Sequence, residues 1–180
     1  MRAAGASSAS RIPVVSRRLV YFGISLAVVA LDQLTKAIVS ARIPLHDTIP
    51  VIQGFFDLTH VKNTGAAFGI FASFSSPARA TILTLVAGGV FLAVLAWSLS
   101  SPVTFTRLQT ALALVLGGAV GNLIDRMRFH SVTDFLRFYV DRWEWPSFNV
   151  ADSAISVGVV LLAWDIWRHP GKEPETCTQN

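Results

Sequence analysis

Apolar residues gather in four long segments that are separated by shorter polar stretches. The segments cover about residues 19–39, 80–99, 108–124 and 151–167. A bilayer core about 30 Å thick needs roughly 20 helical residues to cross it, and spans near 17 residues still suffice. Because lipid offers no hydrogen-bond partner to an exposed backbone amide, each segment should be an α-helix. The pattern therefore predicts an α-helical integral membrane protein with four transmembrane helices.

The stretch between the first two predicted helices has a different pattern. Residues 44–71 contain short apolar runs that are broken by Pro50, Gly54 and Gly65, with partial alternation of apolar and polar positions. Short alternating runs bounded by such residues are typical of strands. We expect a small extracytoplasmic β-rich region here, resting at the membrane surface. In the loop after the third helix, an aromatic cluster beginning at Trp143 is expected at the level of the lipid head groups.

The two ends of the chain are polar. Residues 1–18 are dominated by Ala, Ser and Arg, and we expect them to form a disordered basic leader. A cleaved signal peptide is the alternative, but the following apolar run is long and carries Asp32 and Lys36 where a cleavage site favours small neutral residues. Residues 169–180 are expected to form a polar tail. One transmembrane domain of residues 19–168 remains.

The composition supports lipid as the solvent of this domain. Hydrophobic residues make up 52% of the chain, charged residues 14%, and the mean hydropathy is +0.52. Soluble domains use about a quarter of their positions for charged residues, so a soluble globule is excluded. The chain has one Cys, Cys177, which excludes an internal disulfide framework. The net charge of +4 comes from scattered basic residues, which indicates attraction to anionic membrane lipids and no binding of nucleic acid.

An even number of spans places both termini on the same side of the membrane. Lys and Arg residues are divided evenly between the two sides, so the positive-inside rule alone does not decide the orientation. Arg17 and Arg18 directly precede the first span, and the first helix often dominates orientation. We therefore expect cytoplasmic termini, with the two longer loops on the outer face.

Placing an ionisable or amide side chain inside the membrane costs free energy, so each such residue in a predicted span is a candidate for a structural or functional role. Asp32 and Lys36 are four residues apart and can form an ion pair on one helical face. The pair could simply orient and anchor the first helix, or it could contact a substrate. Asn122 and Arg126 lie at the end of the glycine-rich third helix. Helix packing and a snorkelling Arg would explain the glycines and Arg126, but they explain Asn122 poorly.

Two further carboxylates, Asp134 and Asp152, follow apolar stretches at the predicted membrane interface. Asp152 opens the fourth helix and could be only a helix cap. If the two carboxylates lie together, however, like charge raises the pKa of one of them and leaves one acid and one base near neutral pH. Such a dyad can activate water and protonate a carbonyl. No HExxH, paired-Cys or GxSxG motif occurs, which argues against a zinc or serine hydrolase and predicts no metal.

Taken in order, five sequence blocks resemble the lipoprotein signal peptidase family, also called signal peptidase II. The resemblance covers about residues 19–167, and Thr133 stands where the family more often has Val. One of the blocks, which by itself could be only a turn, begins at Asn63. The blocks are Asp32-Gln33-Leu34-Thr35-Lys36, Asn63-Thr64-Gly65-Ala66-Ala67-Phe68, Gly117-Gly118-Ala119-Val120-Gly121-Asn122-Leu123-Ile124-Asp125-Arg126, Val132-Thr133-Asp134-Phe135 and Phe148-Asn149-Val150-Ala151-Asp152.

This resemblance implies an aspartic endopeptidase of the bacterial inner membrane. It would remove the signal peptide from diacylglyceryl-modified prolipoproteins on the amino side of the lipidated Cys, with no cofactor and with the active site at the outer face. Asp134 and Asp152 would be catalytic. The remaining block residues would line the substrate site (Asn63, Asn122, Arg126 and Asn149) or support the structure (Asp32, Lys36 and Asp125). We expect a monomer.

The main rival dyad is Asp125 with Asp152, because Asp125 also lies at a helix end. Asp125 adjoins Arg126, an arrangement that favours an ionised carboxylate, whereas a dyad needs one carboxyl group that can hold a proton. Two other classes of function stay open from the residues alone. In a small transporter or channel, Asp32, Lys36 and Asp152 would be relay groups, and a structural membrane scaffold would need no convergent acids.

Overall fold

The four predicted helices are present in the computed structural model, which describes residues 14–65, 76–104 and 106–168. They are α1 (Val14–Arg42), α2 (Ser76–Ser100), α3 (Thr106–Phe129) and α4 (Val150–Arg168). All four are long and apolar enough to cross a membrane. Each continues a few residues beyond its apolar segment, so α1 begins within the expected leader. The rest of the leader, the loop containing Ala66–Phe68 and the tail with Cys177 lie outside the described residues.

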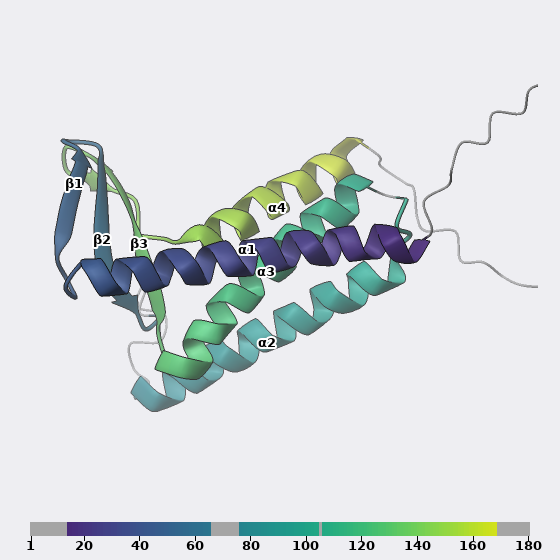
Figure 1. The fold of residues 1–180 in the computed structure, drawn as a ribbon, viewed down its shortest axis with the longest axis horizontal. Coiled ribbons are helices and arrows are strands. Elements are labelled where there is room, and N and C mark those ends of the chain that lie inside the picture. Colours follow the sequence, from purple (N-terminus) through teal and green to yellow (C-terminus); the bar gives the residue numbers. More distant parts are fainter. Residues whose placement is uncertain (1–13, 66–75, 105, 169–180) are drawn as a thin grey trace, which may run out of the picture.

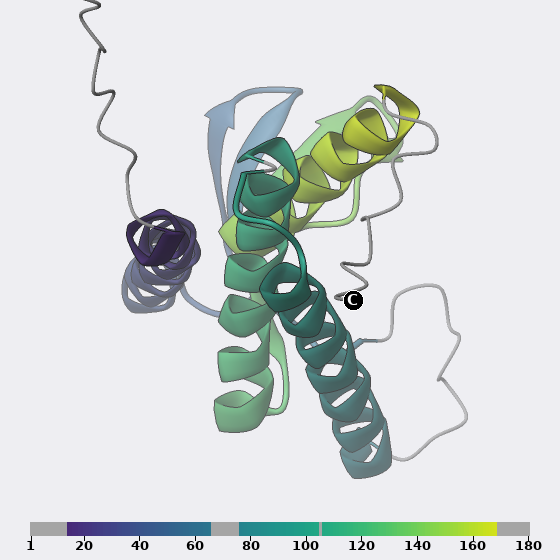
Figure 2. The same ribbon diagram turned by 90° about the vertical axis from the view of Figure 1, so that its right-hand side faces the viewer.

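Helix α3 lies at the centre of the bundle and contacts each of the other three helices (Figure 2). Its glycines permit this close packing. A Cβ atom on Gly117 would stand 2.7 Å from the Val28 Cβ on α1, and one on Gly118 would stand 2.7 Å from the Ile155 Cγ1 on α4. Helix α2 packs along α3 and is otherwise almost entirely exposed, as expected for an apolar helix that faces lipid. Near its end, the backbone oxygens of Ser98 and Leu99 accept hydrogen bonds from Arg18 of α1.

A four-stranded antiparallel sheet stands at one end of the bundle (Figure 1). The strands, in the order β1-β2-β3-β4, are β1 (Thr48–Ile52), β2 (Phe56–Asn63), β3 (Val132–Val140) and β4 (Trp143–Glu144). The first two lie between α1 and α2, as predicted. The sequence did not predict that the loop between α3 and α4 adds β3 and β4 to the same sheet.

The register of β2 and β3 brings two site candidates to one end of the sheet. Val61 pairs with Asp134 and Asn63 pairs with Val132, after an irregularity between Leu58 and Val61. The two strands are joined in sequence only through α2 and α3, so this pairing closes a long excursion of the chain. It places Asn63 and Asp134 beside the end of α3.

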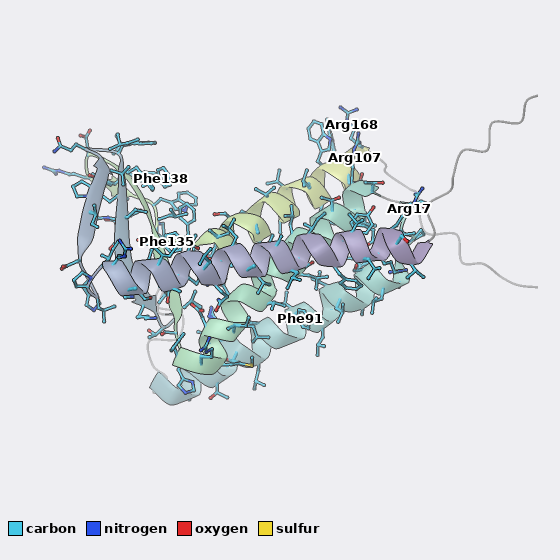
Figure 3. All side chains as sticks on the ribbon, viewed as in Figure 1. Arg17, Phe91, Arg107, Phe135, Phe138 and Arg168 are labelled. Carbon is cyan, nitrogen blue, oxygen red and sulfur yellow. The ribbon has the colours of Figure 1, made fainter. Side chains whose placement is uncertain are left out.

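A small apolar core fastens the sheet to the bundle. Val39 and Ile43 at the end of α1 pack with Phe135 of β3, and all three are buried. Leu58, Leu136 and Val150 surround this cluster. In Figure 3, Phe135 and Phe138 lie at the sheet end, whereas Arg17, Arg107 and Arg168 lie at the opposite end of the bundle. The core fixes the position of β3 relative to the start of α4, where Asp152 lies.

Candidate active site

Asp134 and Asp152 come together at the junction of the sheet with the helices. Asp134 is on β3 with 2% of its surface exposed, and Asp152 is in the first turn of α4, where the helix dipole favours a carboxylate. Both contact Asn149, the residue just before α4. The predicted pair therefore lies in one site, although its members come from different kinds of element.

Asn149 links the two carboxylates through its side chain and its backbone. Its Nδ2 donates to Asp134 Oδ1 at 2.8 Å, and its backbone N donates to Asp152 Oδ2 at 3.2 Å. In return, the backbone N of Asp152 donates to Asn149 Oδ1 at 2.9 Å, which is a capping arrangement at the start of α4. Asn149 is fully buried. Its placement suits the alignment of the two carboxylates better than direct contact with a substrate.

Two more side-chain amides each donate a hydrogen bond to one of the two carboxylates. Asn63 Nδ2 donates to Asp134 Oδ2 at 2.9 Å, while its Oδ1 accepts from the backbone N of Gly65. Asn122 Nδ2 donates to Asp152 Oδ1 at 2.7 Å. Each carboxylate thus accepts two hydrogen bonds from the protein. The amide donors hold both groups in a defined orientation.

Burial makes the carboxyl group of Asp134 a weaker acid than an exposed Asp. The pKa of Asp134 is raised from 3.8 to about 6, because removal from water and the nearby charge of Asp152 outweigh the lowering effect of the hydrogen bonds from Asn63 and Asn149. A carboxyl group of this kind is protonated below pH 6 and can donate a hydrogen bond. This behaviour matches the acid that the dyad hypothesis requires.

A buried charge cluster lies beneath the pair. Lys36 Nζ is 2.8 Å from Asp32 Oδ2 and 3.4 Å from Asp125 Oδ2, and it donates to Asn122 Oδ1 at 3.0 Å. Since the oxygen of Asn122 faces Lys36, its NH₂ group must face Asp152. Asp32 Oδ1 also accepts from the backbone N of Ala151 at 2.9 Å, across to α4. The cluster therefore orients an amide of the site and holds the start of α4.

Comparison with known proteins now identifies the family. A sequence model described as signal peptidase (SPase) II, Peptidase_A8, matches residues 24–168. The chain belongs to the signal peptidase II family. It is 47% identical over 143 residues to a lipoprotein signal peptidase of Desulforapulum autotrophicum, covering 79% of this chain and 88% of that protein. It is 44% identical over 158 residues to the protein of the same name from Nitratidesulfovibrio vulgaris, covering 86% and 93%.

Solved structures agree with this assignment. The chain is similar to a bacterial membrane enzyme determined in meso at 2.3 Å, with a TM-score of 0.74, 28% identity and coverage of 89% of this chain and 94% of that one. A second, at 1.9 Å, gives a TM-score of 0.70 with 30% identity and coverage of 82% and 92%. The protein is thus a peptidase of a bacterial membrane, as the family resemblance implied.

In this signal peptidase II, both carboxylate oxygens of the rival acid, Asp125, accept hydrogen bonds from other residues of the protein. Its Oδ1 accepts from Gln33 Nε2 at 3.0 Å, and its Oδ2 accepts from the backbone N of Thr133 at 2.9 Å while facing Lys36. Its side chain is 2% exposed, and no hydrogen bond joins it to Asp152 among the described residues. These contacts tie Asp125 to α1 and β3 and to the buried Lys36, which suits a supporting residue.

Arg126 of the peptidase has a different environment from the other charged candidates. It lies close enough to Asp152, Asp134 and Asp125 to interact with their charges. Its Nε is buried and has no hydrogen-bond acceptor among the described residues. An unsatisfied donor beside two carboxylates can bind a peptide carbonyl brought by a substrate.

The sequence did not single out Gln33 as part of the peptidase site. Its Nε2 lies within hydrogen-bond distance of Asp32 Oδ2, Gly121 O and Asp125 Oδ1. Its position inside the Asp32–Lys36 block was the only available signal. As for metals, no three His, Cys, Asp or Glu side chains converge within residues 14–65, 76–104 and 106–168.

Proposed function

We propose that the protein is an aspartic endopeptidase that cleaves the signal peptide from diacylglyceryl-modified prolipoproteins, on the amino side of the lipidated Cys. The relatives named lipoprotein signal peptidase support the substrate class. The observation that carries the proposal is the pair Asp134 and Asp152, two carboxylates on separate elements that share Asn149.

The reaction follows the division of roles between an acid and a base. The carboxylate of Asp152 takes a proton from a water molecule as the water oxygen bonds to the scissile carbonyl carbon. Asp134 donates its proton to the carbonyl oxygen, which forms a tetrahedral diol. The proton on Asp152 then moves to the leaving nitrogen, the C–N bond breaks, and the new carboxylic acid group returns a proton to Asp134. Burial of Asp134 supports its role as the initial acid.

Polar side chains around the pair are suited to hold the substrate backbone. We assign this role to Arg126, whose Nε has no acceptor among the described residues, and to Asn63 and Asn122, which border the carboxylates. Asn149 would contribute by aligning Asp134 and Asp152. The diacylglyceryl chains of the substrate would stay in lipid, beside the exposed apolar helices.

The proposed orientation places both termini in the cytoplasm and the sheet and site on the outer face of the bacterial inner membrane. Support comes from the basic residues Arg17, Arg107 and Arg168, which lie together at the bundle end away from the sheet (Figure 3). The chain carries all of the proposed site residues itself, so a monomer suffices for this mechanism.

The decisive experiment measures cleavage of a diacylglyceryl prolipoprotein by purified protein in detergent. Asp134→Asn and Asp152→Asn should each reduce the rate of cleavage by about 10²–10⁴-fold, because each removes a group that transfers a proton. Asp141→Asn, at an exposed turn residue, is the matched control and should retain the wild-type rate.

Two results would contradict the assignment of the dyad. One is full activity in either site variant. The other is an Asp125→Asn protein that remains folded by thermal unfolding yet loses cleavage as completely as Asp152→Asn, which would favour the rival pair.

A further inference from the structure

Two cations that border the site, Lys62 on β2 and Arg128 on α3, lie over one aromatic ring and have no carboxylate partner among the described residues. Lys36 and Arg137 pair with acids: Lys36 with Asp32 and Asp125, and Arg137 with Glu144 in a two-bond contact at 2.9 Å. Lys62 and Arg128 form no ion pair with any described residue. The sequence between Asn63 and Ala80, part of which lies outside the described residues, contains no Asp or Glu that could supply one.

Neutral groups nevertheless hold both cations in place. Lys62 Nζ donates to Thr133 Oγ1 at 2.8 Å and lies 4.8 Å from the centre of the Phe129 ring. The guanidinium carbon of Arg128 lies 5.5 Å from the centre of the same ring. A cation–π contact fixes the position of a cation without cancelling its charge. The result is two positive charges that share one aromatic ring and have no acid partner among the described residues.

The position of these residues in the bundle indicates what they would bind. Phe129 ends α3 at the sheet end, where a transmembrane helix meets the lipid head groups. Phe129 is 52% exposed and Met127, two residues earlier, is 61% exposed, so apolar side chains lie exposed at the same end of α3 as the cations. Exposed apolar side chains next to fixed cations match a phospholipid, whose acyl chains adjoin an anionic phosphate.

We propose that Lys62 and Arg128, held at the ring of Phe129, bind the phosphate of an anionic phospholipid in the leaflet on the sheet side. The proposal does not depend on the cleavage reaction. A diacylglyceryl group on a prolipoprotein carries no phosphate, so the proposed ligand differs from the lipid of the substrate. It would anchor the end of α3, and with it Arg126, at a defined depth in the membrane.

The experiment is native mass spectrometry of the full chain in detergent, titrated with phosphatidylglycerol and, separately, with phosphatidylcholine. The double variant Lys62→Gln, Arg128→Gln should weaken association of phosphatidylglycerol on the order of tenfold, because two interfacial cations are removed. Association of phosphatidylcholine should not change. Phe129→Leu, which keeps an apolar side chain but removes the ring, should give a smaller loss.

The matched control is Arg42→Gln, Arg142→Gln, which removes the same charge from two exposed residues near the sheet. It should bind phosphatidylglycerol as wild type does. Equal weakening in the two double variants would show that net charge alone is responsible, and no weakening in either would also overturn the proposal. A soluble acidic peptide that binds wild type where phosphatidylglycerol does not would assign the cations to a peptide instead.

Discussion

At the scale of single residues, the site depends on how three side-chain amides are oriented, those of Asn63, Asn122 and Asn149. Asn122 presents its oxygen to Lys36 and its NH₂ group to Asp152, while Asn63 donates to Asp134. Amide donors stabilise the charged form of the carboxylate that accepts them. The hydrogen bond from Asn63 therefore lowers the pKa of Asp134, in addition to holding its geometry.

This role of Asn63 predicts a shift in the pH profile of cleavage. Asp134, with a pKa of about 6, loses its proton as the pH rises, so kcat/KM of the wild type should fall above pH 6. Asn63→Ala removes a hydrogen bond that lowers this pKa, and the fall should then begin at a higher pH. Arg42→Gln should leave the midpoint unchanged. A midpoint that is the same in Asn63→Ala and wild type would contradict this role of Asn63.

The buried Lys36 predicts a large loss of stability. Lys36→Met leaves Asp32 and Asp125 without a cation in a buried environment, and loss of one partner of such a pair costs roughly 3–5 kcal/mol. Thermal unfolding in detergent should show a clearly lower midpoint for Lys36→Met. Arg42→Met, at an exposed position, should leave the midpoint almost unchanged. If the Lys36 variant unfolds like the wild type, the charge cluster is not what holds α1 to α4.

Sequence reasoning recovered these residues unequally. Charge is scarce in the chain, so each acid near membrane depth stood out, and Asp134 and Asp152 do lie in one site. Gln33 could not be found in this way. Its partners Gly121 and Asp125 are 88 and 92 residues away, and a neutral amide in a helix carries no signal of such distant contacts.

At the scale of elements, α3 positions the site because the other helices approach its glycines closely. A methyl group on Gly118 would collide with the backbone oxygen of Ala151, one residue before Asp152. Gly89 on α2 has no atom within 4 Å of such a position. A side chain would therefore disturb helix packing at Gly118 but not at Gly89, although both residues lie in apolar helices.

We expect Gly118→Ala to destabilise the protein by about 1–3 kcal/mol and to reduce cleavage, because α4 must shift to make room. Gly89→Ala should be neutral or slightly stabilising, since Ala favours a helix more than Gly does. Thermal unfolding and the cleavage assay together test the pair of variants. Equal effects of the two substitutions would show that close packing of α3 on α4 is unimportant.

The helices were easier to predict from sequence than the sheet. A long apolar run is a local signal, and only the helix ends differ, because polar residues at the membrane boundary continue the helix. Strand β3 has no such signal. Its residues Val132–Val140 pair with a strand about 70 residues earlier, and its buried first half does not alternate between apolar and polar positions.

At the scale of the whole molecule, the proposed orientation makes the two ends of the bundle chemically accessible from opposite sides. The native chain has one thiol, Cys177, in the C-terminal tail. In intact spheroplasts, a membrane-impermeant maleimide should leave Cys177 unlabelled and should label it after permeabilisation. A Glu144→Cys, Cys177→Ser protein, with its thiol on exposed β4, should be labelled in intact spheroplasts. The reverse pattern would invert the topology.

The hydrogen bond from Ala151 to Asp32 joins positions 119 residues apart, on the first and last helices. A ribosome that feeds this chain into the membrane releases α1 long before α4. Until α4 arrives, Asp32 lacks this partner and Asp152 is absent. The peptidase should therefore stay inert throughout its own insertion and gain activity only when its last helix joins the first.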